Sequence, residues 1–99
     1  MAAGNASSID PNYRTVMIGR GIITFGHEVG GSNEEKVDYY HQALVRYQEA
    51  AALLPDDPRP LLYEGLCYER LTGIAQSPEE KRQQFGLGEA ALRKTLACR

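Results

Sequence analysis

Residues 43–68 read ALVRYQEAAALLPDDPRPLLYEGLCY, and this stretch decides the fold. Ala43, Tyr47 and Ala50 follow the i, i+4, i+7 spacing of one helical face, and the same spacing returns after the prolines. The Pro-Asp-Asp-Pro turn between the two segments ends the first helix and gives the second a capping aspartate and a first-turn proline. Two helices joined by so short a turn fold back on each other as an antiparallel pair.

The size and charge of the chain narrow the classes of function. Its 99 residues carry 11 Lys and Arg against 13 Asp and Glu, a formal net charge of −2. That length suits one domain, and the acidic balance argues against a nucleic-acid partner, which needs a basic face. No apolar run is long enough to cross a bilayer, and the first residues do not resemble a signal peptide. We therefore expect a soluble, cytoplasmic protein without membrane insertion.

The chain divides into a short tail and one helical domain. Residues 1–9 are small and polar, and we expect them to be flexible. Residues 10–98 form the domain, with a first repeat over 10–55 and a second over 56–98. Cap and stop signals delimit the elements within each repeat.

The segment from Tyr13 to Val29 is open to two interpretations. Its β-branched residues favour a strand, and each of its three glycines costs a helix about 1 kcal/mol relative to alanine. We predict a helix, because Gly19 and the large residues around it repeat the small-and-large stripe around Gly65.

Two capping boxes mark the starts of further helices. Ser32-Asn-Glu-Glu35 opens a helix that runs to about Leu54, and Ser77-Pro-Glu-Glu80 opens the last one. Between them a third helix runs from about Arg59 to Leu71. The apolar residues expected on the inner faces are Tyr40, Ala43, Leu44, Tyr47, Ala50, Ala51 and Leu54 on the second helix and Phe85, Leu87, Ala91, Leu92 and Leu96 on the last.

An internal repeat organises these elements. The segment SNEEK at 32–36 returns as SPEEK at 77–81, a shift of 45 residues. Repeats of this length are typical of stacked helical arrays. The predicted fold is all-α, with two helix-turn-helix repeats that make four antiparallel helices. The pairs related by the repeat are Tyr40 with Phe85, Ala43 with Gly88, Tyr47 with Leu92, Ala50 with Thr95 and, one position out of step, Gly19 with Gly65 and Ile22 with Tyr68.

This pattern resembles the tetratricopeptide repeat family. The positions that match its second helix are Ala43, Tyr47, Ala50 and Pro55, and those that match its following first helix are Gly65 and Tyr68. The chain departs from the family at Leu61, where tryptophan is usual, and at Glu64, where leucine is usual. Each unit is also about ten residues longer than the family's repeat of roughly 34.

The resemblance implies a right-handed α-solenoid whose first helices line a concave groove for a partner. Leu62, Tyr63 and Leu66 stand where chaperone-binding members have the lysine and asparagine of a carboxylate clamp, so that clamp is absent. The mixture of apolar and arginine side chains suits an amphipathic helix or an extended apolar segment. The alternative is that Leu62 and Leu66 pack against neighbouring helices. The expected groove residues are Arg59, Leu62, Tyr63, Leu66 and Arg70, joined by Tyr13, Val16, Met17 and Arg20.

The expected function is that of a non-enzymatic scaffold or adaptor that binds a protein or peptide partner, without catalytic residues or cofactor. Two repeats without a capping helix leave apolar end faces, so we expect the chain to form a homodimer or to dock on a larger assembly. A second interpretation is a structural subunit whose helices are consumed by a permanent interface, with no free peptide groove.

A third interpretation, a metal or redox protein, has little support in the residues. His27-Glu28 and the pair Asp38 and His41 are the nearest approach to a ligand cluster, and no spacing typical of a metal motif is present. Cys67 and Cys98 are too few for a disulfide framework or a zinc site. We expect no metal.

Overall fold

The computed structural model describes residues 11–29 and 31–97, with side chains for 13–24 and 31–97. This part of the chain is helical throughout its regular structure and has no strand, as the sequence predicts, and the segment from Tyr13 is a helix. None of the described helices is long and apolar enough to cross a membrane. The predictions for residues 1–9 and Cys98 lie outside the described residues. The helices are α1 (Pro11–Val29), α2 (Asn33–Leu53), α3 (Pro58–Gly73) and α4 (Pro78–Ala97).

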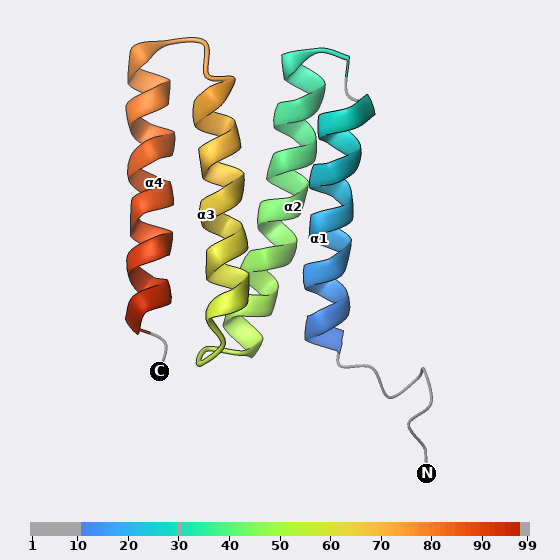
Figure 1. Ribbon diagram of the computed structural model, residues 1–99, viewed down its shortest axis with the longest axis vertical. Helices are drawn as coiled ribbons and strands as arrows, with labels where there is room; N and C mark the ends of the chain where they lie inside the picture. The colour runs from blue at the N-terminus through green and yellow to red at the C-terminus, as the bar shows by residue number, and fades with distance from the viewer. Residues whose placement is uncertain (1–10, 30, 98–99) are drawn as a thin grey trace.

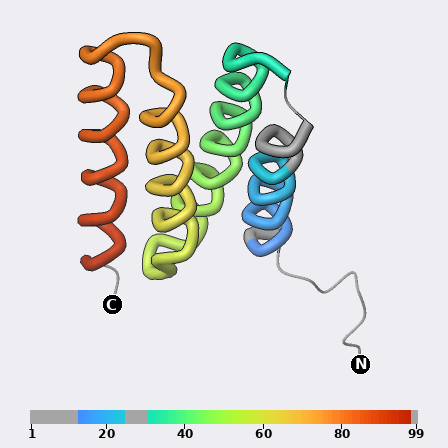
Figure 2. Tube along the Cα trace, turned by 45° about the horizontal axis from the view of Figure 1, so that its top comes forward, coloured from blue at the N-terminus to red at the C-terminus, as the bar shows by residue number. Residues whose placement is uncertain are grey.

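The four helices stand side by side in chain order, with α1 at one edge and α4 at the other (Figures 1 and 2). The hairpins α1–α2 and α3–α4 are joined by packing of α2 against α3, whereas α1 touches α3 only lightly. The shortest dimension of the molecule is 15 Å. Because an array this thin has solvent on both broad faces, its helices bury stripes of side chains between neighbours.

Serine caps begin α2 and α4. The backbone N–H of Glu35 donates to Ser32 Oγ at 3.1 Å, and that of Glu80 donates to Ser77 Oγ at 3.1 Å. The hydrogen bonds that the two glutamates accept differ from those of an ideal capping box, in which the carboxylate accepts the backbone N–H of the capping serine. The Glu35 carboxylate accepts from the Ser32 hydroxyl at 3.3 Å, and the Glu80 carboxylate accepts from the backbone N–H of Gln76 at 2.6 Å. Both helix starts are thus fixed by the predicted serines.

The turn between α2 and α3 is held by Asp57. Its Oδ1 accepts the backbone N–H of Arg59 at 3.0 Å, which satisfies one of the free donors at the start of α3, and Pro58 occupies the first turn. The carboxylate also forms an ion pair with the Arg59 guanidinium. The side-chain hydrogen bond from Arg59 lowers the pKa of Asp57, although partial desolvation opposes this shift. The sequence-predicted cap is therefore present and charged.

The core lies along α2, which has a neighbour on each side. Of the seven residues predicted to face inward on the second helix, five are buried, whereas Ala51 and the C-cap residue Leu54 are half-buried. A stripe of this kind is expected when the apolar positions of a helix recur every three to four residues. The core residues are Val16 and Ile23 of α1, Tyr40, Ala43, Leu44, Tyr47 and Ala50 of α2, and Cys67 and Leu71 of α3.

Glycines let each hairpin close tightly. In the first hairpin the ring of Tyr47 lies against Gly19, and in the second the side chain of Leu92 lies against Gly65. The internal repeat relates Gly19 to Gly65 and Tyr47 to Leu92. Both hairpins therefore place a large side chain of the second helix over a glycine of the first.

The outer helix α4 differs from α2 in how much it buries. Of the apolar residues that the sequence predicts along it, Ala91 is buried, whereas Phe85, Leu87, Leu92 and Leu96 are exposed. The difference follows from position, because α4 packs against α3 alone among the described helices. This edge of the array carries an uncovered apolar surface.

Candidate partner-binding groove

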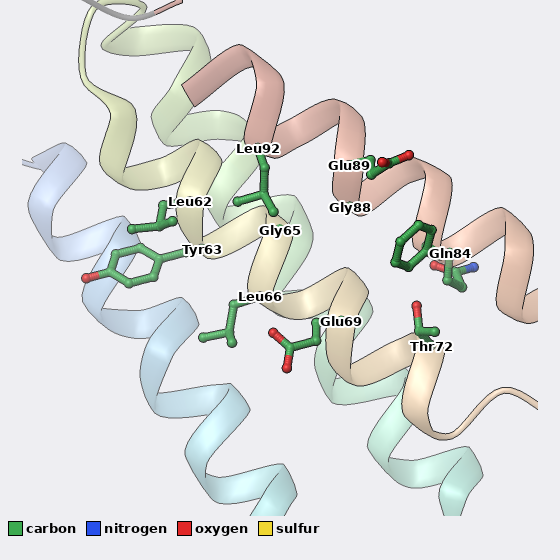
Figure 3. Close-up of a pocket in the computed structure, with 11 residues that line it drawn as sticks. Leu62, Tyr63, Gly65, Leu66, Glu69, Thr72, Gln84, Gly88, Glu89 and Leu92 are labelled. Atoms are coloured by element: carbon green, nitrogen blue, oxygen red, sulfur yellow. The ribbon is translucent and has the colours of Figure 1, made fainter. Parts of the chain in front are cut away.

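A groove of about 500 Å³ lies between α3 and α4 on one broad face (Figure 3). Large apolar side chains make most of its wall, and Leu92 reaches from α4 toward Gly65. Exposed apolar surface gathered in a hollow is typical of a binding site for another molecule. The lining residues are Leu62, Tyr63, Gly65, Leu66, Glu69 and Thr72 of α3 and Gln84, Phe85, Gly88, Glu89 and Leu92 of α4.

The close approach of α3 and α4 explains why this surface is open. A Cβ placed on Gly65 would lie 3.7 Å from the carbonyl oxygen of Gly88, and the converse distance is also 3.7 Å. With small residues at the line of contact, the helix backbones pack directly on each other. The larger residues, Leu62, Leu66 and Phe85, are left beside the contact and face solvent.

The charged groups of the groove are both acidic. Glu69 projects from α3 and Glu89 from α4, while Thr72 and Gln84 lie near one another at one end (Figure 3). No lysine or arginine is among the lining residues. Neither glutamate forms an ion pair with another described residue. The groove is therefore apolar with carboxylates on two sides.

Besides lining the groove, the Tyr63 side chain of α3 contacts the first hairpin. The Tyr63 ring centroid lies 5.3 Å from that of Tyr47, and the Arg20 guanidinium carbon lies 5.3 Å from the Tyr63 centroid. Both distances suit attractive aromatic and cation–π contacts. The cleft beside them has a volume of about 20 Å³, with room for about one water molecule. It is too small to hold a peptide.

The predicted groove residues therefore fall into separate places. Leu62, Tyr63 and Leu66 line the groove, but they do so with α4, whereas the sequence pointed to the first helix as the opposite wall. Val16 lies in the core and offers little surface to a partner. Arg70 is half-buried and lines neither space. The residues around the narrow cleft are Tyr13, Val16, Met17, Arg20, Arg59 and Tyr63, together with Leu54, Asp57 and Pro60.

Sequence reasoning missed Phe85 and Leu92 as groove residues. Both were expected among the apolar packing residues of the last helix, and both are exposed. The repeat pairs them with Tyr40 and Tyr47, and the Tyr63 ring of α3 packs on Tyr47. Among the described helices α4 packs against α3 alone. The match of Phe85 to Tyr40 and of Leu92 to Tyr47 in the internal repeat was the feature of the sequence that could have identified them as groove residues.

Two ionisable groups of α3, Glu64 and Cys67, are buried and do not line the groove. Burial raises the pKa of the Cys67 thiol to about 12, and the nearby Glu64 charge adds to the shift. Burial also raises the pKa of Glu64, against the opposing effect of Lys94. A thiol that stays protonated is a poor nucleophile, so Cys67 acts as a small core residue.

Asp38 and His41 are the residues of the metal-site interpretation whose side chains the structure describes. Asp38 accepts a hydrogen bond from Gln42 Nε2 at 2.8 Å, and His41 faces a hollow of about 690 Å³ near the helix-connecting loops. No three His, Cys, Asp or Glu side chains in residues 13–24 and 31–97 are placed to hold a metal ion. The side chains of His27 and Glu28 lie outside the described residues.

Comparison of the chain with protein-family models, with curated proteins and with solved structures gives no match.

Proposed function

We propose that this chain is a non-enzymatic protein-binding module that serves as a scaffold or adaptor. The observation that carries the proposal is the apolar groove between α3 and α4, whose leucine and phenylalanine side chains are exposed. Apolar side chains clustered in a hollow supply the anchor contacts from which protein interfaces draw most of their binding energy. The groove contains no cluster of nucleophile and base that would indicate catalysis.

The membership in a tetratricopeptide-like family and the right-handed α-solenoid arrangement belong to the same proposal. They are supported by the two hairpins of similar construction, with Gly19 under Tyr47 and Gly65 under Leu92. In such an array the first helix of each hairpin presents a surface to partners, and here that surface comes from Leu62 and Leu66 of α3.

A binding experiment with matched variants tests the proposal. The full chain serves as bait for cell extract, beside a Leu62→Glu/Leu66→Glu variant and a control, Leu53→Glu, at an exposed leucine on α2. We expect a protein that elutes with the wild type and the control and is lost with the groove variant. Far-ultraviolet circular dichroism of all three proteins checks that the helices persist. If the wild-type chain and the groove variant captured every protein in equal amounts, the result would contradict the proposal.

The alternative is a structural subunit whose groove is permanently covered. The breadth of the apolar surface favours this alternative as well, because Leu87 and Leu96 of α4 are also exposed. The reversibility of partner binding distinguishes the two functions. An adaptor releases its captured protein on dilution, with the free chain remaining folded, whereas a permanent subunit gives lower yield and aggregates when Leu62 and Leu66 are replaced.

A further inference from the structure

The internal repeat gives the second hairpin, α3 and α4, the same construction as the first hairpin, α1 and α2, on which α3 packs. Gly19 and Tyr47 in the first hairpin correspond to Gly65 and Leu92 in the second, and each pair makes the same contact. The correspondence extends along the second helices, where Tyr40 matches Phe85. What covers α2 in the first hairpin therefore indicates what fits α4 in the second.

The matched residues differ sharply in exposure. Tyr40 and Tyr47 are 2% and 0% exposed, and their counterparts Phe85 and Leu92 are 60% and 45% exposed. The cover over the first pair includes α3, since the Tyr63 ring packs on Tyr47. The groove between α3 and α4 thus corresponds, in the second hairpin, to the surface of the first hairpin that α3 helps to cover.

The residues that α3 places against the first hairpin show which spacing of apolar residues a segment bound in the groove would need. Pro60, Cys67 and Leu71 are buried there and Tyr63 is half-buried, with spacings of three and four residues. That spacing is one apolar stripe of a helix three turns long. A segment of this shape covers about 16 Å along the groove, at 1.5 Å per residue.

The charges of the groove distinguish its occupant from α3. Where the first hairpin has Leu44, the second has Glu89, and Glu69 lies on the opposite wall. Two copies of this chain meeting groove to groove would bring four carboxylates together, which opposes association. A helix with lysine or arginine beside its apolar stripe would instead pair with Glu69 and Glu89.

We propose that the groove between α3 and α4 binds a basic amphipathic helix of a partner protein, seated on the second hairpin as α3 is seated on the first. This inference rests on the proposed protein-binding function and names the partner's chemistry. Its apolar stripe contacts Phe85, Leu92 and Leu66, and its basic flanks contact Glu69 and Glu89.

Labelled peptides of the length of α3, 16 residues, test the inference against the intact chain by fluorescence anisotropy. The probe has leucine at the spacing of Pro60, Tyr63, Cys67 and Leu71, lysine on both flanks and alanine elsewhere. One comparison peptide replaces each lysine with glutamate, and another carries a central proline that breaks the helix. We expect the lysine peptide to bind at least about tenfold more tightly than either comparison peptide, and its advantage over the glutamate peptide to shrink as salt is added.

Variants of the chain locate the binding. The double substitution Glu69→Lys/Glu89→Lys should reverse the preference between lysine and glutamate peptides. Phe85→Ser should weaken the lysine peptide at least about tenfold, while Leu53→Ala, at an exposed leucine outside the groove, should leave it unchanged. Phe85 is exposed, so its replacement leaves the fold intact, which circular dichroism verifies.

Four results would overturn the inference while leaving the protein-binding function to its own test. Equal binding of the lysine and glutamate peptides would remove the charge argument. Equal binding of the proline peptide would mean that the groove takes an extended segment. A concentration-dependent dimer that Phe85→Ser dissociates would assign the groove to a second copy. Absence of binding by every peptide would also refute the basic helix, whereas loss of the protein-binding function would appear as equal recovery in the extract experiment.

Discussion

The aromatic ring of Tyr47 lies so close to Gly19 that a Cβ at position 19 would stand 2.6 Å from Tyr47 Cε1. The Tyr47 side chain is wholly buried. This contact sets the spacing of α1 and α2 at the centre of the core. By contrast, a Cβ at Gly21, one residue beyond Arg20, would meet no atom within 4 Å.

Alanine at these two glycines should therefore have opposite effects on the free energy of unfolding. Overpacking a core costs about 1–3 kcal/mol, and alanine gains a helix about 1 kcal/mol over glycine. We expect Gly19→Ala to lower stability by a net amount on the order of 1 kcal/mol and Gly21→Ala to raise it by up to about 1 kcal/mol. Urea denaturation measures both. Equal changes in the two variants would contradict the close contact.

Removal of the Asp57 cap should destabilise α3. Asp57→Ala leaves the backbone N–H of Arg59 without its acceptor, and loss of such a cap costs about 0.5–2 kcal/mol. Asp57→Asn keeps the acceptor and should retain most of that stability. Because the folded-state pKa of Asp57 is lowered, its ionised form stabilises the fold above the unfolded-state pKa, and this contribution is lost as pH falls.

Urea midpoints from neutral pH down to pH 3 measure this effect. The difference between wild type and Asp57→Asn should narrow toward the acid end. A constant difference over that range would mean that the Asp57 charge contributes nothing.

Glu64 should produce the opposite pH dependence. Its folded-state pKa is raised, chiefly by burial, so the native state binds more protons than the unfolded state between the two pKa values. Its contribution to stability therefore decreases as pH rises through that window. We expect Glu64→Gln to be more stable than wild type at pH 7 and similar to it below pH 4. Thermal unfolding at several pH values tests this, with Glu69→Gln as the exposed control, and a lower stability of Glu64→Gln at neutral pH would be the contrary result.

Cys67 should resist thiol reagents as long as the protein is folded. It is fully buried, and burial raises the pKa of its thiol to about 12, so very little of it is thiolate at neutral pH. In a Cys98→Ser variant, Cys67 is the one remaining thiol and reports its own reactivity. We expect labelling by a disulfide reagent at pH 8 to be slow in buffer and immediate in concentrated guanidinium chloride. Rapid labelling in buffer would place the thiol at the surface.

The sequence could predict the elements of this fold better than it could predict the candidate site. Ser32, Ser77 and Asp57 mark helix starts by local chemistry, and that chemistry acts whatever the surroundings. The inward stripe of α2 was also predictable, because a helix between two neighbours buries the face that its apolar spacing defines. These features depend on residues close in sequence.

The groove depended on which helices meet, and spacing alone does not give that information. Helical periodicity identified Phe85 and Leu92 as apolar positions but could not say whether another helix covers them. The family resemblance directed attention to α1 as the partner of α3, while the larger open space lies against α4. Arg70, expected at the same surface as Leu66, is turned into a half-buried position away from the groove.

Among the described helices α4 packs against α3 alone and α1 packs chiefly against α2, so the array is held mainly by contacts between neighbouring helices. An array linked in this way opens from its edges, so the backbone amides of α4 should exchange with deuterium sooner than those of α2. A partner bound between α3 and α4 would give the outer helix a second neighbour and slow that exchange. Protection of α4 amides would then serve as a signal of an occupied groove, readable without a label on either molecule.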